Sequence, residues 1–91
     1  MAMVVCEVRP EAGTVAVSVA VRDINNVRTF LEIQKDFVTQ RQGQSYLPIG
    51  VVGIDRDKGV ALIEFPVEAD SGAHRIWVPL SSLVGLNGVP A

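Results

Sequence analysis

The strict alternation of residues 14–22 constrains the fold of this chain more than any other feature. Valine stands at every odd position of the segment, and small or polar residues stand at nearly all the even ones. A two-residue period of β-branched side chains is typical of a strand with one buried face. Residues 3–9 alternate as well, and residues 10–13 favour a turn because they combine Pro with Gly. We therefore expect a β-hairpin. Its first strand places Val4, Cys6 and Val8 on one face and Val5, Glu7 and Arg9 on the other.

Small residues make up the second face of the 14–22 strand. This face lacks the Lys and Glu side chains that are usual on a solvent-exposed strand. Its small side chains allow another layer to approach closely, either a helix of this chain or the same strand of a second subunit. The alternative is a solvent-exposed face that merely lacks large residues. The candidate interface residues are Thr14, Ala16, Ser18 and Ala20.

Residues 27–42 are expected to form one amphipathic helix. At 100° per residue, the apolar side chains fall on one contiguous side and the charged ones on the other. Asp23, Asn25 or Asn26 can cap the start, and Gly43 suits a left-handed residue at the C-terminal end. The predicted apolar stripe, expected to pack on the sheet, consists of Val27, Phe30, Leu31, Ile33, Phe37 and Val38.

The remainder of the chain returns to β-structure, which completes an α+β fold in the order β-β-α-β-β-β. The further strands are expected at residues 47–54, 60–65 and 75–78, the first of them bent or bulged at its glycines and the second central in the sheet. We expect an antiparallel five-stranded sheet, curled toward a small barrel, with the helix against it. Ninety-one residues suffice for one core, so residues 1–91 form a single domain, with an ordered core at 3–84 and a frayed tail at 85–91.

The C-terminal half resembles the end of SH3-like barrels. Two hairpin-linked strands precede the segment Ile76-Trp77-Val78-Pro79-Leu80-Ser81-Ser82-Leu83-Val84. In those barrels an aromatic-hydrophobic-Pro segment runs into a single helical turn and a final short strand. The resemblance therefore implies a half-barrel geometry. The Asn-Tyr pair that SH3 domains use against proline-rich peptides would fall near Ser81 and Ser82, so the resemblance implies no proline-rich ligand.

Charge and hydropathy limit the classes of partner. The net charge is −2 and the pI is about 5.2, whereas nucleic-acid-binding modules usually carry a basic face. We expect no nucleic-acid partner, because the helix would separate Arg28 from Arg41. The mean hydropathy of +0.32 is high for a small domain and indicates a further surface buried against a partner. We therefore predict a homodimer, or binding of another protein.

The single cysteine and the chain's start indicate a cytoplasmic protein. Cys6 has no partner for an internal disulfide and is expected to be a small buried hydrophobe. Residues 1–7 lack the basic and long apolar regions of a secretory signal. The longest apolar run, residues 60–65, is too short to span a membrane, so we expect no membrane partner. No set of His, Cys and acidic residues has metal-ligand spacing, and we assign no metal and no cofactor.

The polar loop of residues 68–75 is the one candidate ligand site. It contains Ser, His and Asp, but a hydrolase triad is assembled from distant segments, and we find no nucleophile-elbow or phosphate-loop motif. The simplest interpretation is a solvated loop in which Gly72 takes a positive φ. As a site, it would hold an anion with His and Arg, and the only Trp, expected mainly to pack in the core, would line the pocket. The candidate ligand-binding residues are Asp70, Ser71, His74, Arg75 and Trp77.

Two functions from different classes remain open. The first is a small non-enzymatic cytoplasmic binding or assembly module that acts as a homo-oligomer. It is favoured by the small-residue face and by the lack of catalytic motifs. The alternative is a small-ligand-binding or enzymatic protein with its site at the loop of residues 68–75. No catalytic residue is assigned in either case.

Overall fold

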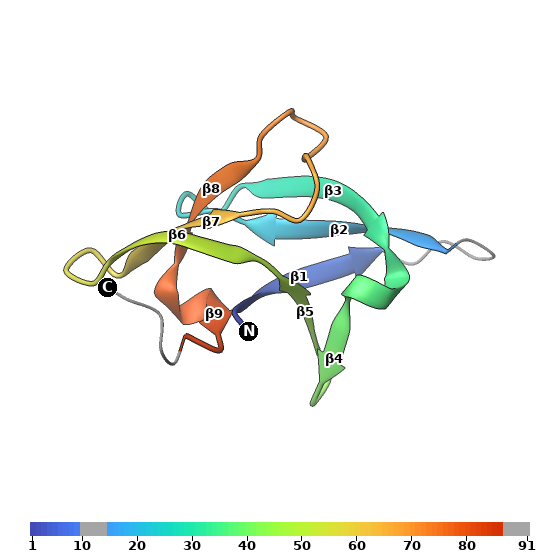
Figure 1. The fold of residues 1–91 in the computed structure, drawn as a ribbon, viewed down its shortest axis with the longest axis horizontal. Coiled ribbons are helices and arrows are strands. Elements are labelled where there is room, and N and C mark those ends of the chain that lie inside the picture. The colour runs from blue at the N-terminus through green and yellow to red at the C-terminus, as the bar shows by residue number, and fades with distance from the viewer. Residues whose placement is uncertain (10–14, 87–91) are drawn as a thin grey trace.

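The computed structural model describes residues 1–9 and 15–86, which form nine strands and two short 3-10 helices (Figure 1). The predicted turn at residues 10–13, Thr14 and the end of the predicted tail, residues 87–91, lie outside the described residues. The strands are β1 (Met3–Arg9), β2 (Ala16–Arg22), β3 (Arg28–Gln34), β4 (Thr39–Arg41), β5 (Gln44–Pro48), β6 (Gly50–Asp55), β7 (Val60–Glu64), β8 (Arg75–Pro79) and β9 (Leu83–Val84). The 3-10 helices are η1 (Lys35–Phe37) and η2 (Leu80–Ser82).

The larger sheet is organised around β1. Its strand order is β3-β2-β1-β5-β4, and β9 also pairs with β1. The predicted strands at residues 3–9 and 14–22 are confirmed as β1 and β2, which pair antiparallel. Val17, Val19 and Val21 are buried, as the alternation predicts. Val15 was expected on the same face but is 81% exposed, because it precedes the first residue of β2 that pairs with β3.

The predicted helix over residues 27–42 does not form, and the α+β fold class is therefore wrong. The segment folds instead as β3, η1 and β4, and the described residues contain no α-helix. Every residue of β3 pairs with β2, from Arg28 opposite Arg22 to Gln34 opposite Ala16. This long-range ladder satisfies the backbone and buries one strand face, and it outweighs a local periodic pattern.

Side-chain burial along β3 shows why the helical projection was misleading. Leu31 and Ile33 are buried, whereas Glu32 between them is exposed, which is strand alternation. Phe37, expected in the buried helical stripe, is 42% exposed. Leu31 and Ile33 fit both a helical and a strand period, whereas Phe30 belongs to the helical stripe but lies on the opposite strand face, next to Ala20.

The residues expected to cap a helix form a hairpin turn between β2 and β3. Oδ1 of Asp23 accepts hydrogen bonds from the backbone N–H groups of Asn25 at 2.8 Å and Val27 at 3.0 Å. Asn26 takes a left-handed φ of 62°, a conformation that Asn tolerates better than most residues. An Asx-type turn thus reverses the chain where a helical N-terminus was predicted.

The predicted single five-stranded sheet is wrong, because the strands divide between the larger sheet and a second sheet of order β6-β7-β8. β7 is its central strand, as expected, and the ladder between β6 and β7 has the predicted irregularity, between Val51 and Gly53. Two backbone hydrogen bonds link this part of the chain to β3 and its turn: Ile24 donates to Trp77 at 3.0 Å, and Asp70 donates to Phe30 at 2.8 Å. The fully buried core side chains come from both sheets and include Val4, Leu31, Leu47, Ile63 and Val78.

The helical turn expected at residues 79–83 is present as η2, and the short β9 that follows it returns to β1. The structure is thus almost entirely β, and the SH3-like resemblance stays a prediction. Within the described ranges, no helix has both the length and the apolar character to cross a membrane.

Candidate functional site

The outer face of β1, β2 and β3 surrounds small side chains with larger, charged ones. Ser18 and Ala20 face outward from β2, the middle strand. Ser18 pairs with Arg9 of β1, while Ala20 pairs with Glu7 of β1 and Phe30 of β3. Because the β2 side chains are small here, those of the two neighbouring strands can meet above them.

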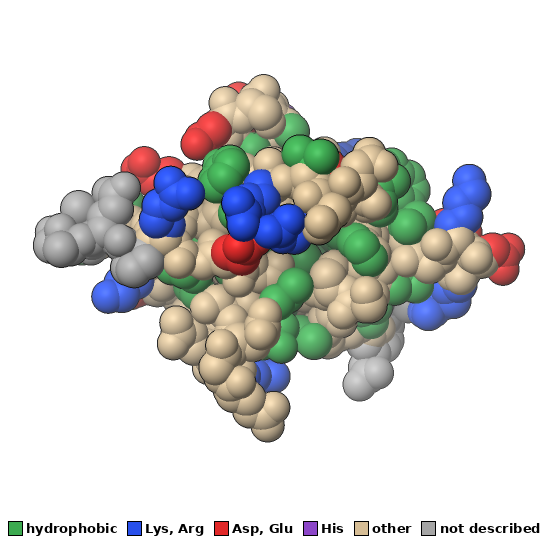
Figure 2. Space-filling model, turned by 180° about the vertical axis from the view of Figure 1, so that it is seen from behind, with side chains coloured by type: hydrophobic (Ala, Val, Ile, Leu, Met, Phe, Trp, Pro, Cys, Tyr) green, Lys and Arg blue, Asp and Glu red, His purple; other side chains and the backbone are tan. Residues whose placement is uncertain are grey.

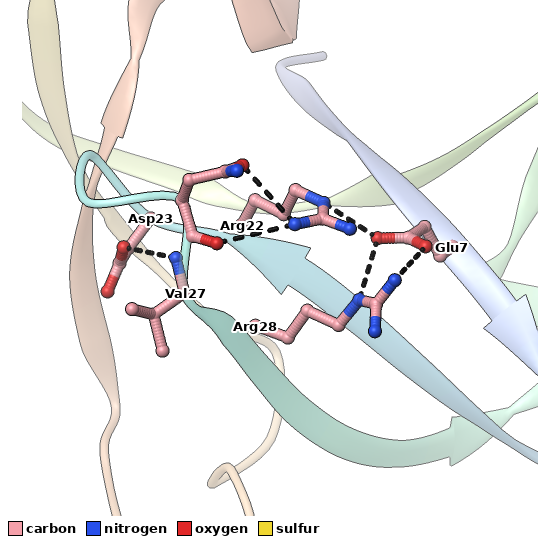
Figure 3. A network of polar contacts seen from close by, with 6 residues as sticks. Glu7, Arg22, Asp23, Val27 and Arg28 are labelled. Carbon is pink, nitrogen blue, oxygen red and sulfur yellow. Dashed lines mark hydrogen bonds and ion pairs between the residues drawn. The ribbon is translucent and has the colours of Figure 1, made fainter.

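Glu7 is the centre of an ion-pair network on this face (Figure 3). Nε of Arg22 donates to Oε1 of Glu7 at 3.0 Å. Arg28 donates to both carboxylate oxygens, from Nε to Oε1 and from Nη2 to Oε2, each at 3.3 Å. Asn26 accepts two hydrogen bonds from Nη1 of Arg22. Since Glu7 stands on β1 and Arg28 on β3, the network crosses over β2.

This network lowers the pKa of the Glu7 carboxyl below its ordinary value of 4.5. The hydrogen bond from Arg28 is the largest cause. Desolvation, the next largest, acts in the opposite direction, and the charges of both arginines and the hydrogen bond from Arg22 add to the lowering. Hydrogen bonds to the charged form favour ionisation. Glu7 is therefore a carboxylate at neutral pH.

Arg9 and Phe30 form a second contact above β2. The guanidinium carbon of Arg9 lies 5.8 Å from the ring centroid, within cation–π range. Beneath these contacts Ala20 is only 5% exposed, and Ala16 and Ser18 are half-buried. The helix that was one candidate cover for the small-residue face is absent, and side chains of β1 and β3 cover part of it instead.

Three hollows along the outer face of β1 adjoin one another through shared lining residues, and together we call them the β1 groove. The first has a volume of about 240 Å³, and the second, of about 390 Å³, shares Glu7 and Ala20 with it. The third, also of about 390 Å³, shares Val5, Gln44 and Ser82 with the second. The groove thus follows β1 from Arg9 toward its N-terminal end.

Segments distant in sequence build the far end of the β1 groove. Pro79 contributes from the end of β8, Ser82 from η2, Tyr46 from β5 and Arg41 from β4. Oγ of Ser82 donates to the carbonyl oxygen of Pro79 at 2.7 Å, which ties η2 together. Only the tertiary fold brings these residues to the same surface.

Positive charge is concentrated in the β1 groove, although the chain as a whole is acidic. Figure 2, the view from behind, shows basic side chains beside an acidic one on this side of the molecule. Its described lining holds half of the chain's eight Lys and Arg residues but only two of its ten acidic ones. The basic residues are Arg9, Arg22, Arg28 and Arg41, and the acidic ones are Glu7 and Asp23.

The predicted ligand-binding residues of the 68–75 loop are not joined in one site. His74 lies 3.8 Å from Glu68, with both side chains exposed, and Arg75 pairs with Glu64 of β7. Oγ of Ser71 accepts a hydrogen bond from the backbone N–H of Ala73, and Asp70 uses its backbone to reach β3. Gly72 takes the predicted positive φ, 90°. Across the described residues, no hydrogen bond or ion pair links any two of the five predicted side chains.

Trp77 lies on the outer face of the second sheet. It is 43% exposed, so the expectation that it packs mainly in the core is wrong. Its cross-strand neighbour is Leu62 of β7, and Leu62 in turn lies opposite Gly53, next to Val52 in the β6 bulge. Val52 is 44% exposed. This row of apolar side chains is separate from the β1 groove.

Cys6 is buried on the inner side of β1, as predicted. Burial, and to a smaller degree the neighbouring Glu7 charge, raise the pKa of its thiol to about 11. The thiol is therefore protonated and unreactive at neutral pH. Among residues 1–9 and 15–86, no three His, Cys, Asp or Glu side chains are grouped so as to hold a metal ion.

Sequence reasoning missed the charged residues of the β1 groove. The alternation of β1 already placed Glu7 and Arg9 on its outward face, which was a usable signal. Arg28 and Phe30 had been assigned to the predicted helix, so their position beside Ala20 could not be foreseen. Comparison of the chain with protein-family models, with curated proteins and with solved structures gave no match. The candidate site therefore rests on the geometry of this chain alone.

Proposed function

We propose that this protein is a small non-enzymatic binding module of the cytoplasm and that the β1 groove is its binding surface. The observation that carries the proposal is the continuity of the groove, whose three sections share lining residues from Arg9 to the η2 turn. Its floor is a rigid sheet, and an extended partner can lie along such a floor without reorganising the fold.

The absence of a reactive arrangement in the groove supports binding over catalysis. One of its two carboxylates, Glu7, is held by two arginines and has a lowered pKa, opposite to what a general acid requires. The adjacent thiol of Cys6 has a raised pKa, opposite to what a nucleophile requires. Neither group is prepared for chemistry near neutral pH.

Panning of a random peptide display library against the immobilised protein tests the binding surface. Gln44→Trp places a large side chain where two sections of the groove meet, so selected peptides should bind the wild type and lose at least tenfold in affinity for this variant. Arg56→Trp, in the exposed β6–β7 turn, is the matched control and should bind normally. Selected peptides that ignore Gln44→Trp would refute the groove as the binding surface.

We also propose that the module is a homodimer, which the mean hydropathy of +0.32 supports. The apolar row of Val52, Leu62 and Trp77 offers a surface away from the β1 groove. Sedimentation velocity over a dilution series should show a dimer that Trp77→Ser weakens and Val15→Ser, at another exposed apolar position, leaves intact. A clean monomer at micromolar concentration would rule the homodimer out.

A further inference from the structure

We propose that the β1 groove binds an extended, acidic segment of a partner protein. This inference rests on the proposed binding function and adds the chemistry of the partner. The first ground is charge complementarity, since four arginines line the groove of a chain whose net charge is −2. Complementary charge of this kind selects partners and speeds their association.

The second ground is that arginines at the middle of the groove already hold a carboxylate. Arg22 and Arg28 together make three hydrogen bonds to Glu7. The Arg28 donation through Nε and Nη2 is the side-on fork that suits a carboxylate. The groove therefore has the local geometry to receive acidic side chains.

The third ground is that two further arginines of the groove have no acidic partner among the described residues. Within the described ranges, neither Arg9 nor Arg41 forms an ion pair with an acidic side chain. Arg9 is positioned by its contact with the Phe30 ring. A carboxylate of an incoming peptide gains the most binding free energy at these two arginines.

The length of the groove matches an extended peptide. Val5, Glu7 and Arg9 all face it, and four residues of strand span about 13 Å. An extended ligand of about four to six residues covers that distance and places every second side chain toward β1. An acidic residue at one end of such a segment would approach Arg9. The other end would reach the third section of the groove, which Arg41 lines from the side, on β4 beyond β5.

The acidic residues within the groove favour a peptide over a nucleic acid. Glu7 and Asp23 lie among the arginines, and a phosphate backbone, which is charged at every nucleotide, would be repelled there. A peptide can place a neutral or basic residue opposite them. The mixed signs of charge along the groove therefore select a heteropolymer with acidic ends.

Fluorescence anisotropy with labelled octapeptides tests this inference. We expect a serine octapeptide with two Glu residues at each end to bind at low ionic strength, with an affinity that falls as salt is added. A Lys–Ser peptide and an eight-nucleotide oligothymidylate should bind at least tenfold more weakly. Arg9→Glu and Arg41→Glu should each weaken the acidic peptide about tenfold, whereas Arg56→Glu, the same charge change outside the groove, should change it less than twofold.

Several outcomes would overturn the inference. If Arg56→Glu lost as much affinity for the acidic peptide as Arg9→Glu and Arg41→Glu, the effect would be one of general charge. If the oligonucleotide bound as tightly as the acidic peptide, the groove would be a polyanion site. Selected peptides that lack acidic residues and yet depend on Gln44 would refute the acidic partner and leave the proposed function standing. If nothing binds in either assay, both proposals fail. Circular dichroism of each variant, with Arg9→Gln as a milder change, excludes unfolding as the cause.

Discussion

Leu31 offers the sharpest test of the strand that replaces the predicted helix. Its side chain is fully buried in the core beneath β3. Leu31→Ala removes three carbon groups, which at ~0.8 kcal/mol each gives about 2.5 kcal/mol of lost transfer free energy. The cavity left behind adds about 1 kcal/mol, so the free energy of unfolding should fall by roughly 3 to 4 kcal/mol. For a domain of this size, that lowers Tm by about 15 to 25 °C.

Urea denaturation followed by the fluorescence of Trp77 and by circular dichroism measures this loss. Phe37→Ala is the matched control, because the helical pattern buried both residues whereas the strand fold leaves Phe37 42% exposed. The control should cost under about 1 kcal/mol. Ile33→Val, which removes one buried methyl group, should cost about 1 kcal/mol and keeps the test usable if Leu31→Ala does not fold. Equal losses for Leu31→Ala and Phe37→Ala would refute the assignment of β3.

Three further predictions address titration and turn geometry. Cys6 should resist a disulfide reagent at pH 8 in the folded protein. Because the pKa of its thiol rises from 9.0 to about 11 on folding, the stability of the protein should hold below pH 9 and decline as the pH approaches 11. A pH-independent Tm over this range would contradict the buried thiol. Arg28→Met should move the pKa of Glu7 upward toward 4.5 in a carboxyl NMR titration, and an unchanged titration would disprove the ion pair. In the wild type, the stability that the lowered pKa contributes is present above pH 4.5 and should be lost as the pH falls. Gly59→Ala, at a φ of 68°, should lower the free energy of unfolding by about 1 kcal/mol. Gly53→Ala, with open space around the added Cβ, should lower it less. Equal Tm values for the two variants would count against a left-handed Gly59.

The candidate site was only partly accessible from sequence. Alternation placed Ser18 and Ala20 on one face of β2, and it placed Glu7 and Arg9 on the outward face of β1. The interaction among these residues depends on strand neighbours, since Arg28 reaches Glu7 only because β3 lies beside β2. Strand order is set by long-range pairing, which no local pattern encodes.

The sequence by itself determined the local β-structure wherever alternation was strict or a turn residue was unambiguous. β1, β2, the β6 irregularity and the η2 turn are of this kind. Tertiary structure decided residues 27–42, because buried residues such as Leu31 and Ile33 fit two periods and only the ladder with β2 selected the strand. It also decided the candidate binding surface. The small-residue face of β2 indicates room above the strand, and the fold determines that side chains of β1 and β3 occupy that room and line the β1 groove.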